Sequence, residues 1–395
     1  MDELKYQSTE DQYFESIRPY LDHEVRPAVV QLLQHPVVQE VISQITPPEM
    51  SRSLDHLVQE VDSVSSFKSI ILAPILYHLL SKNAFSVTTS GRSQLSKDKR
   101  YLFISNHRDI VMDSALINAS VLKGGLSLPR IAIGDNLLIE EWIRSLVRLA
   151  GAFVVIRKPS IREMLAESER LSHYIRTSIV GGEESVWLAQ REGRTKDSND
   201  TTQTALLKML TLSSNERDPG RALAPLNIVP VSLSYEYDPC DFLKAKEMLQ
   251  KELDPSFTKS PMDDLISMQT GVMGQKGRVH ITFAQPLSHL EEIGQHTKNR
   301  QEVLEMAAKE IDRGIFLNYR FYPCNYIAYD LQHGGSQFAK MYSNKERAAF
   351  ELYLQQQIDK IKMEGKDSHF LLQRLLEMYS NPLRNNLLAK KELRS

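Results

Sequence analysis

Cysteine, charge of one sign and long apolar runs are all scarce in this 395-residue chain. Cys240 and Cys324 are the only cysteines, and they form no C-x-x-C pair, which argues against a disulfide framework or a zinc site. The 48 Lys and Arg residues nearly balance the 50 Asp and Glu residues, for a net charge of -2. A general nucleic-acid binder needs a broadly basic surface, so we expect no nucleic-acid partner.

The chain also lacks an obvious membrane or export segment. Met1 to Gln7 has acidic residues and no apolar core, so we expect no signal peptide. The longest apolar run, Ile70 to Leu80, is interrupted by Pro74 and His78, whereas a bilayer span needs about 20 apolar residues. We therefore expect no transmembrane helix, and a cytoplasmic protein whose membrane contact, if any, is peripheral and on the cytoplasmic face. The segment 67–80 fits an interfacial helix and a core helix equally well.

The pattern along the chain changes at residue 84. Residues 12–82 have helical periodicity, with breaks at His35-Pro36 and Thr46-Pro47-Pro48. Short β-type runs then alternate with helical segments as far as residue 283, which predicts an α/β fold. The expected strands are 85–89, 101–104, 130–133, 152–156, 185–189, 228–234 and 279–283. We predict a helical N-terminal cap at 1–83, an α/β domain at 84–290 and a helical C-terminal segment at 291–395.

The most informative motif is Ser-Asn-His-Arg-Asp-Ile-Val-Met-Asp, residues 105–113, directly after a predicted strand. A histidine at a strand end with a carboxylate soon after suits a general base pair. Its imidazole, with an ordinary pKa of about 6.5, can take a hydroxyl proton near neutral pH. The carboxylate would fix the tautomer and stabilise the imidazolium. The same segment also fits a helix N-terminus capped by Asn106 or Asp109.

The spacing of the pair constrains where it can lie. On one helix with 3.6 residues per turn, His107 and Asp113 would be about 240° apart and could not share a face. His107 must therefore precede the helix that carries Asp113. Asp109 is the competing partner, and we favour Asp113.

The motif resembles the signature of the glycerol-3-phosphate and lysophosphatidate acyltransferases, where four residues rather than five separate His and Asp. Three further segments resemble that family's later blocks, in the same order. Gly151 to Lys158 resembles its glycine–aromatic–Ile–Arg block, and Trp187 to Lys196 its Phe-Pro-Glu-Gly-Thr-Arg-Ser block. Ile228 to Ser232, with Pro230 as a structural residue, resembles its apolar-Pro-apolar block. The resemblance covers about residues 85–290 and implies a mixed central sheet with flanking helices.

The resemblance also implies a site. It implies His107 as general base, oriented by Asp113. It assigns acceptor binding to Arg157, Glu192, Gly193, Arg194 and Lys196. The third block here reads Glu-Gly-Arg-Thr-Lys, which leaves the positions of its two cations relative to a phosphate open. From the residues alone, Arg157 could be a solvated surface charge, and Glu192 a salt-bridge partner of Arg157 or Arg194.

The implied reaction moves a fatty acyl group from acyl-CoA or acyl-ACP to a hydroxyl of glycerol-3-phosphate or lysophosphatidate, in phospholipid biosynthesis. It needs no acyl-enzyme, no metal and no cofactor beyond the thioester co-substrate. A kinase catalytic loop also begins His-Arg-Asp, but Ser114 stands where that loop needs Asn. The alternative is a catalytically inactive relative that acts as a membrane-associated lipid-binding or scaffold protein. The altered His–Asp spacing favours this alternative, and the joint presence of base, acid and cations argues against it.

Overall fold

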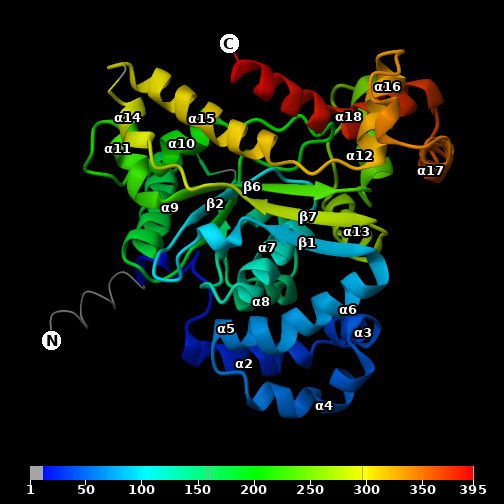
Figure 1. Ribbon diagram of the computed structural model, residues 1–395. Coiled ribbons are helices and arrows are strands. Elements are labelled where there is room, and N and C mark those ends of the chain that lie inside the picture. Colours follow the sequence, from blue (N-terminus) through cyan, green and yellow to red (C-terminus); the bar gives the residue numbers. More distant parts are fainter. Residues whose placement is uncertain (1–11, 158, 161, 296, 395) are drawn as a thin grey trace, which may run out of the picture.

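The computed structural model describes residues 12–157, 159–160, 162–295 and 297–394, which are built around one seven-stranded sheet (Figure 1). The strands are β1 (Ser86–Ser90), β2 (Leu102–Ser105), β3 (Arg130–Gly134), β4 (Ala152–Val155), β5 (Val186–Ala189), β6 (Ile228–Tyr235) and β7 (Arg278–Phe283). Their order across the sheet is β1-β7-β6-β2-β5-β3-β4. The strands from β6 to β4 are parallel, whereas β7 is antiparallel to β6 and β1 is parallel to β7. The expected mixed sheet with flanking helices is confirmed.

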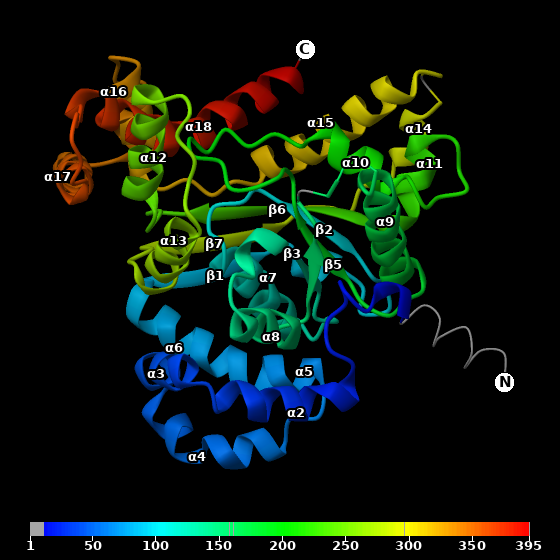
Figure 2. The ribbon, with the colours of Figure 1, turned by 180° about the vertical axis from the view of Figure 1, so that it is seen from behind.

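Helices cover both faces of the sheet, which is why its central strands are apolar. The helices beside the sheet are α7 (Met112–Lys123), α8 (Glu141–Leu149), α9 (Met164–Val180), α10 (Thr204–Leu210), α11 (Pro219–Leu223), α14 (Leu290–Ile293) and α15 (Arg300–Leu317). Successive residues of a strand point to opposite faces. In β2, Leu102 and Ile104 pack with α9, α10 and α15, whereas Phe103 packs with α7. The fold is thus a three-layer helix–sheet–helix arrangement (Figure 2).

The N-terminal cap is helical, as expected. It contains α2 (Asp22–Leu33), α3 (Pro36–Ile45), α4 (Pro48–Gln59), α5 (Val64–Ser66), a π-helical turn (Phe67–Leu72) and α6 (Ala73–Asn83). Pro36 and Pro48 begin helices, because the first helical position needs no backbone N–H donor. Val29, Phe67 and Leu149 of α8 share one apolar core, which joins the cap to the rest of the fold.

One stretch of the cap meets the length and composition of a membrane span. Val64–Asn83 is helical over 20 residues with a mean hydropathy of 1.3. The expectation of no transmembrane helix therefore stays a prediction, because this stretch meets the criteria of a span by length and composition only. Within this stretch 39% of the most apolar window is buried, and Phe67, Ile71 and Leu79 pack in the cap core. The length alone does not separate a core helix from a span.

The C-terminal helices pack around a helix from the middle of the chain. They are α16 (Pro323–Gln332), α17 (Asn344–Lys360) and α18 (Ser368–Glu392). The central helix, α12 (Asp241–Leu253), lies with α13 (Pro261–Met273) between β6 and β7 in the chain, and neither was expected from the sequence. Leu249 of α12 packs with Phe350 and Tyr379. Since α15 packs on the sheet instead, the apolar clusters cross the expected boundary at residue 290.

Pro230 lies inside β6, where it pairs with Ile104 and faces α15. A Cβ atom on Gly314 of α15 would lie 2.6 Å from the Pro230 Cγ atom. The helix can therefore pack this close to the sheet only because residue 314 has no side chain.

Replacing Gly314 by alanine should lower the free energy of unfolding by up to about 2 kcal/mol. Overpacking usually costs about 1–3 kcal/mol, and a gain in helix propensity of about 1 kcal/mol offsets part of this cost. Urea denaturation measures the change. Gly335→Ala is the matched control, because a Cβ atom there meets nothing within 4 Å. Equal stability of the two variants would contradict the close packing of α15 on Pro230.

Candidate active site

The side chains singled out in the sequence follow the carboxyl ends of parallel strands. His107 follows β2, and Arg157 follows β4. Glu192 and Gly193 follow β5, the neighbour of β2. Parallel strands end at the same edge of a sheet, and open α/β sheets bind their ligands there. The sheet thus brings these residues to one edge.

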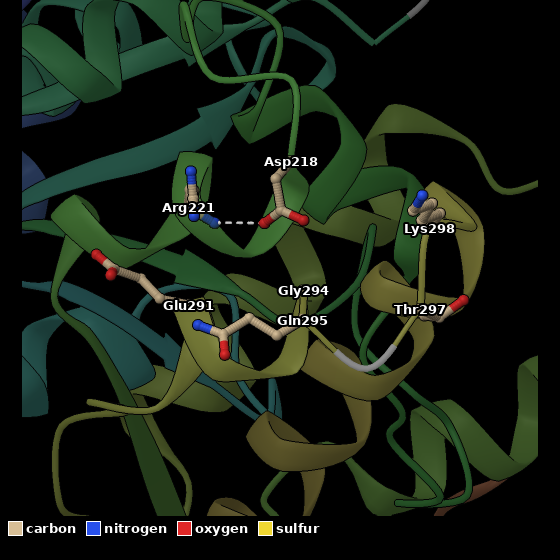
Figure 3. A pocket seen from close by; sticks show the side chains of 7 residues that line it. All are labelled: Asp218, Arg221, Glu291, Gly294, Gln295, Thr297 and Lys298. Carbon is tan, nitrogen blue, oxygen red and sulfur yellow. Dashed lines mark hydrogen bonds between the residues drawn. The ribbon is translucent and has the colours of Figure 1, made fainter.

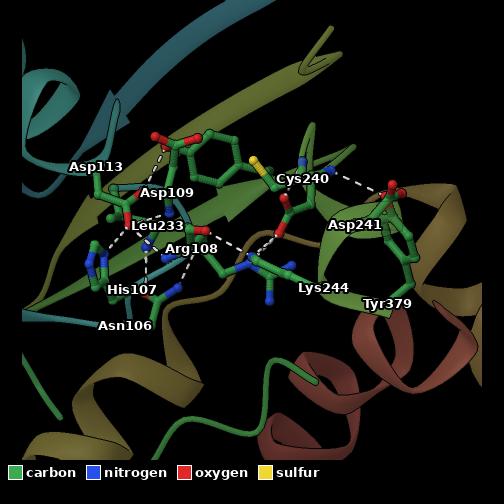
Figure 4. Close-up of polar contacts among 12 residues, drawn as sticks. Asn106, His107, Arg108, Asp109, Asp113, Leu233, Cys240, Asp241, Lys244 and Tyr379 are labelled. Atoms are coloured by element: carbon green, nitrogen blue, oxygen red, sulfur yellow. Dashed lines mark hydrogen bonds and ion pairs between the residues drawn. The ribbon is translucent and has the colours of Figure 1, made fainter. Parts of the chain in front are cut away.

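His107 and Asp113 are in contact (Figure 4). His107 lies in the loop before α7, and Asp113 is the second residue of that helix. The His107 Nδ1 atom is 2.8 Å from the Asp113 Oδ2 atom, so the expected pairing is confirmed. The ring packs edge-on against Trp187 and is largely buried. None of the described residues forms a hydrogen bond with Nε2, which leaves this nitrogen for a substrate proton.

The Asp113 carboxylate accepts three further hydrogen bonds. Its Oδ2 atom accepts from the backbone N–H groups of Arg108, at 2.6 Å, and Asp109, at 2.9 Å. Its Oδ1 atom accepts from the Tyr235 hydroxyl at 2.8 Å. Burial and the negative charge of Asp113 raise the pKa of Tyr235 well above its usual value, so Tyr235 stays a donor. The fully buried carboxylate is thus satisfied, and the loop absorbs the extra residue between His107 and Asp113.

Asp109, the competing partner, has a different role. Its Oδ1 atom accepts from the backbone N–H groups of Val111, at 3.0 Å, and Met112, at 2.9 Å, where α7 begins. Burial, followed by the charge of Asp113, raises the pKa of Asp109. Its Oδ2 atom lies so close to α13 that a Cβ atom on Gly271 would come within 1.9 Å. Asp109 therefore caps a helix under α13.

Asn106 positions the loop, although the sequence suggested only a cap. Its Nδ2 atom donates to the Leu233 carbonyl at 3.0 Å, and its Oδ1 atom accepts from the Leu233 N–H at 2.8 Å. The side chain thus pairs with β6 as a strand backbone would. This double contact fixes the end of β2 directly before His107.

A buried ion pair from the α12 region holds the residue after His107. The Lys244 Nζ atom donates to the Arg108 carbonyl at 2.8 Å and to the Asp238 carboxylate. Burial alone would raise the pKa of Asp238, but the charges of Lys244 and Arg108 lower it. The Tyr379 hydroxyl of α18 accepts from the Asp238 N–H at 3.1 Å. This clamp of Lys244, Asp238 and Arg108 was not expected from the sequence, because its members are far apart in the chain.

Arg157, Glu192 and Gly193 form a second group. The Arg157 Nη1 atom is 3.3 Å from the Glu192 Oε1 atom, so Arg157 is not a lone surface charge. Gly193 has a φ of +69°, which favours glycine, and its Cα faces the same guanidinium. A Cβ atom on Gly134 would lie 2.2 Å from the Arg157 Nε atom. The guanidinium therefore rests on the backbone at the end of β3.

Arg194 and Lys196 point to α13 and α12, the two helices between β6 and β7 in the chain. The Arg194 Nη2 atom is 3.9 Å from the Asp264 Oδ1 atom of α13. The Lys196 Nζ atom is 3.1 Å from the Glu247 Oε2 atom of α12. Burial lowers the pKa of Lys196 to about 8, against the opposing charge of Glu247. Among the described residues, the ion pairs of these two cations are with α12 and α13 and not with the group around Arg157.

A surface pocket of about 560 Å³ lies elsewhere, near the start of β6 (Figure 3). Its lining is polar and of mixed charge, and consists of Asp218, Arg221, Glu291, Gly294, Gln295, Thr297 and Lys298. None of the residues predicted for the site lines it. Strand β6 begins at Ile228, so this pocket is at the opposite edge of the sheet from His107.

Residues 86–233 match the family model described as Acyltransferase, and this segment contains every residue predicted for the site. Residues 86–233, which are less than half of the chain, therefore form an acyltransferase domain, and the protein is an acyltransferase. The crystal structure of the 1-acyl-sn-glycerophosphate (LPA) acyltransferase PlsC from Thermotoga maritima is similar, with 12% sequence identity and a TM-score of 0.32 over 73% of this chain and 85% of that one. This TM-score is too low to support a shared substrate or mechanism. A comparison with curated proteins finds no match.

Replacing Lys244 by methionine should lower the free energy of unfolding by about 3–5 kcal/mol, the usual cost of removing one partner of a buried ion pair. The buried Asp238 then keeps only Arg108 as a cationic partner, at 3.8 Å. In the double variant Lys244→Met/Asp238→Asn, urea denaturation should show that much of the loss is recovered. The kcat should be lower than in the wild type in both the single and the double variant, since the Arg108 carbonyl lacks its donor in each. Lys251→Met, at an exposed position of the same helix, is the control. Full recovery of kcat together with stability would show that the clamp does not position His107.

Proposed function

We propose that this acyltransferase moves a fatty acyl group from acyl-CoA or acyl-ACP to a hydroxyl of glycerol-3-phosphate or lysophosphatidate, in phospholipid biosynthesis. One observation carries the proposal: an imidazole at the carboxyl edge of the sheet is bonded through Nδ1 to the buried Asp113 carboxylate. This arrangement suits a general base whose Nε2 atom takes a proton from a hydroxyl.

The proposed reaction proceeds by direct attack. The acceptor hydroxyl gives its proton to the His107 Nε2 atom while its oxygen attacks the thioester carbonyl carbon. The tetrahedral intermediate then collapses, the C–S bond breaks, and the leaving sulfur takes the proton back from the imidazolium. Asp113 stabilises the imidazolium between these steps. The products are an ester and a free thiol.

The two cysteines are poor candidates for an acyl-enzyme. Both are buried, and burial raises the pKa of Cys240 to about 12 and also raises that of Cys324. The Cys240 thiol donates to the Ser267 carbonyl, and the Cys324 thiol to that of Glu236. Because the thiolate is the nucleophilic form of cysteine, this supports a mechanism without a covalent intermediate.

In the proposed complex Arg157 binds the acceptor phosphate. Its guanidinium is partly exposed, and its partner Glu192 is largely exposed, so a phosphate can reach it. A guanidinium can hold a phosphate through two hydrogen bonds. Glu192 and Gly193 shape the same pocket. Arg194 and Lys196 already pair with Asp264 and Glu247, so they would attract the phosphate through their positive charge and not by direct contact.

We place the protein in the cytoplasm, with peripheral contact at the cytoplasmic face of a membrane. A lipid acceptor or product partitions into membranes. Met262 and Ile266 are exposed on α13, the helix that pairs with Arg194. Exposed apolar side chains beside a site suit contact with lipid.

Replacing His107 by alanine should reduce kcat by about two to four orders of magnitude, the usual contribution of general base catalysis. Release of free thiol from acyl-CoA in the presence of the acceptor measures the rate. His56→Ala, at an exposed position of α4, is the control. Turnover at the wild-type rate would contradict the role of His107, and absence of turnover in the wild type would favour an inactive relative.

Replacing Arg157 by alanine should raise the acceptor KM roughly ten- to hundredfold, since a hydrogen bond to a charged group contributes about 1.5–3 kcal/mol. The donor KM should not change. Arg157→Lys should retain part of the affinity, and Arg144→Ala on α8, also partly exposed, is the control. An unchanged acceptor KM in Arg157→Ala would remove this residue from the phosphate site.

A further inference from the structure

Buried polar atoms without hydrogen-bond partners gather in the loop between β5 and α10. Among the described residues sixteen such side-chain atoms occur, and seven of them belong to residues 190–200. They are on Gln190, Arg191, Arg194, Thr195, Ser198 and Asp200. Ser198 also has a φ of +60°, a strained value for a residue other than glycine. Such a concentration indicates a place that a ligand or ordered water completes.

Asp200 is the extreme member of this group. Its side chain is fully buried, and neither of its carboxylate oxygens has a hydrogen-bond partner with good geometry. Burial raises its pKa, and the nearby Thr195 hydroxyl opposes this rise. The positive charge of Arg108 also opposes it. The loop that carries Asp200 begins beside the catalytic loop, where the Gln190 N–H donates to the Ser105 carbonyl at 2.9 Å.

The loop does not need Asp200 to hold its shape. The Asp312 Oδ1 atom of α15 accepts from Gln190 Nε2 at 3.0 Å and from the Thr202 N–H and hydroxyl at 2.8 and 2.6 Å. Asn381 and Asn385 of α18 hold residues 197 and 199 in the middle of the loop. Both ends and the centre are therefore anchored by other side chains. A purely structural role does not explain an unpaired carboxylate inside this frame.

The chemistry of the proposed reaction limits what Asp200 can bind. The Thr195 hydroxyl has one proton to donate, so it leaves a carboxylate oxygen of Asp200 open to a further donor. The reacting hydroxyl of the acceptor gives its own proton to His107, so a donor from the acceptor would be a second hydroxyl. Glycerol-3-phosphate has a free hydroxyl beside the reacting one, whereas in lysophosphatidate an acyl chain occupies that position. The loop runs from the largely exposed Glu192 to the buried Asp200, so the same loop carries Asp200 and the residues expected to bind the acceptor.

We propose that Asp200, with Thr195 beside it, binds the free hydroxyl next to the one that is acylated, and so selects a glycerol phosphate with two free hydroxyls over lysophosphatidate. This inference rests on the proposed function and names its acceptor. Asp200 is then an acceptor-binding residue that sets specificity.

The experiment compares glycerol-3-phosphate with 3-hydroxypropyl phosphate, which keeps the phosphate and one hydroxyl but lacks the second. The wild type should prefer glycerol-3-phosphate by roughly ten- to hundredfold in kcat/KM, the loss expected for one hydrogen bond to a charged group. In Asp200→Ala this preference should fall to about one. A wild type without the preference, or a variant that keeps it, overturns the inference.

The stability of Asp200→Asn is a second measurement. If Asp200 had a structural role, this substitution would lower the midpoint of urea denaturation. Asp200→Asn removes a buried, unpaired charge, so its midpoint in urea denaturation should equal or exceed that of the wild type. A lower midpoint overturns the inference. Asp312→Asn, which removes a carboxylate with three donors, is the comparison and should lower the midpoint.

Lysophosphatidate separates the two levels of failure. Transfer to lysophosphatidate but not to glycerol-3-phosphate leaves the proposed function standing and overturns the role of Asp200. No transfer to either acceptor, with acyl-CoA or acyl-ACP as donor, overturns both. Efficient transfer to glycerol-3-phosphate, with the preference lost in Asp200→Ala, supports both.

Discussion

The Asp113 carboxylate is the interaction on which the catalytic loop depends. It is fully buried, and it accepts from the His107 ring, from two consecutive backbone N–H groups and from the Tyr235 hydroxyl. One charge therefore fixes the orientation of the imidazole, the shape of the turn after β2 and the approach of β6. A carboxylate buried at this depth is stable only because each of its oxygens is satisfied. The rigidity of the base thus follows from the need to compensate one buried charge.

Around this centre, the rest of the chain supports the loops at the carboxyl edge of the sheet. The inserted helix α12 contributes Lys244, which holds the Arg108 carbonyl, and Glu247, which pairs with Lys196. Helix α13 passes over Asp109 at a distance that only Gly271 permits. The helical parts outside the matched segment therefore reach the same two loops that carry the proposed chemistry. Their packing places side chains that the local sequence of those loops cannot place alone.

The sequence predicted the parts of this structure that depend on local patterns. Alternating apolar runs located all seven strands, and the spacing from His107 to Asp113 required the loop-then-helix geometry. Long-range pairing was out of reach. Nothing near Arg108 indicates that Lys244, 136 residues later, bonds to its carbonyl. Likewise, the sequence alone does not show the acidic partners of Arg194 and Lys196. These partners, Asp264 and Glu247, lie on helices inserted between β6 and β7, and helical periodicity does not show which surfaces pack together.

The anchoring of the 190–203 loop has a consequence for how the chain is organised. Asn381 and Asn385, near the C-terminus, bond to this loop across more than 180 positions of sequence. Modularity is therefore low: the last helix is part of the wall of the catalytic region and not an appendage. Swapping it for that of a relative would change the shape of that wall even though residues 86–233 stayed the same. The part of the chain that shapes this loop is therefore longer than residues 86–233, the segment that matches the family model.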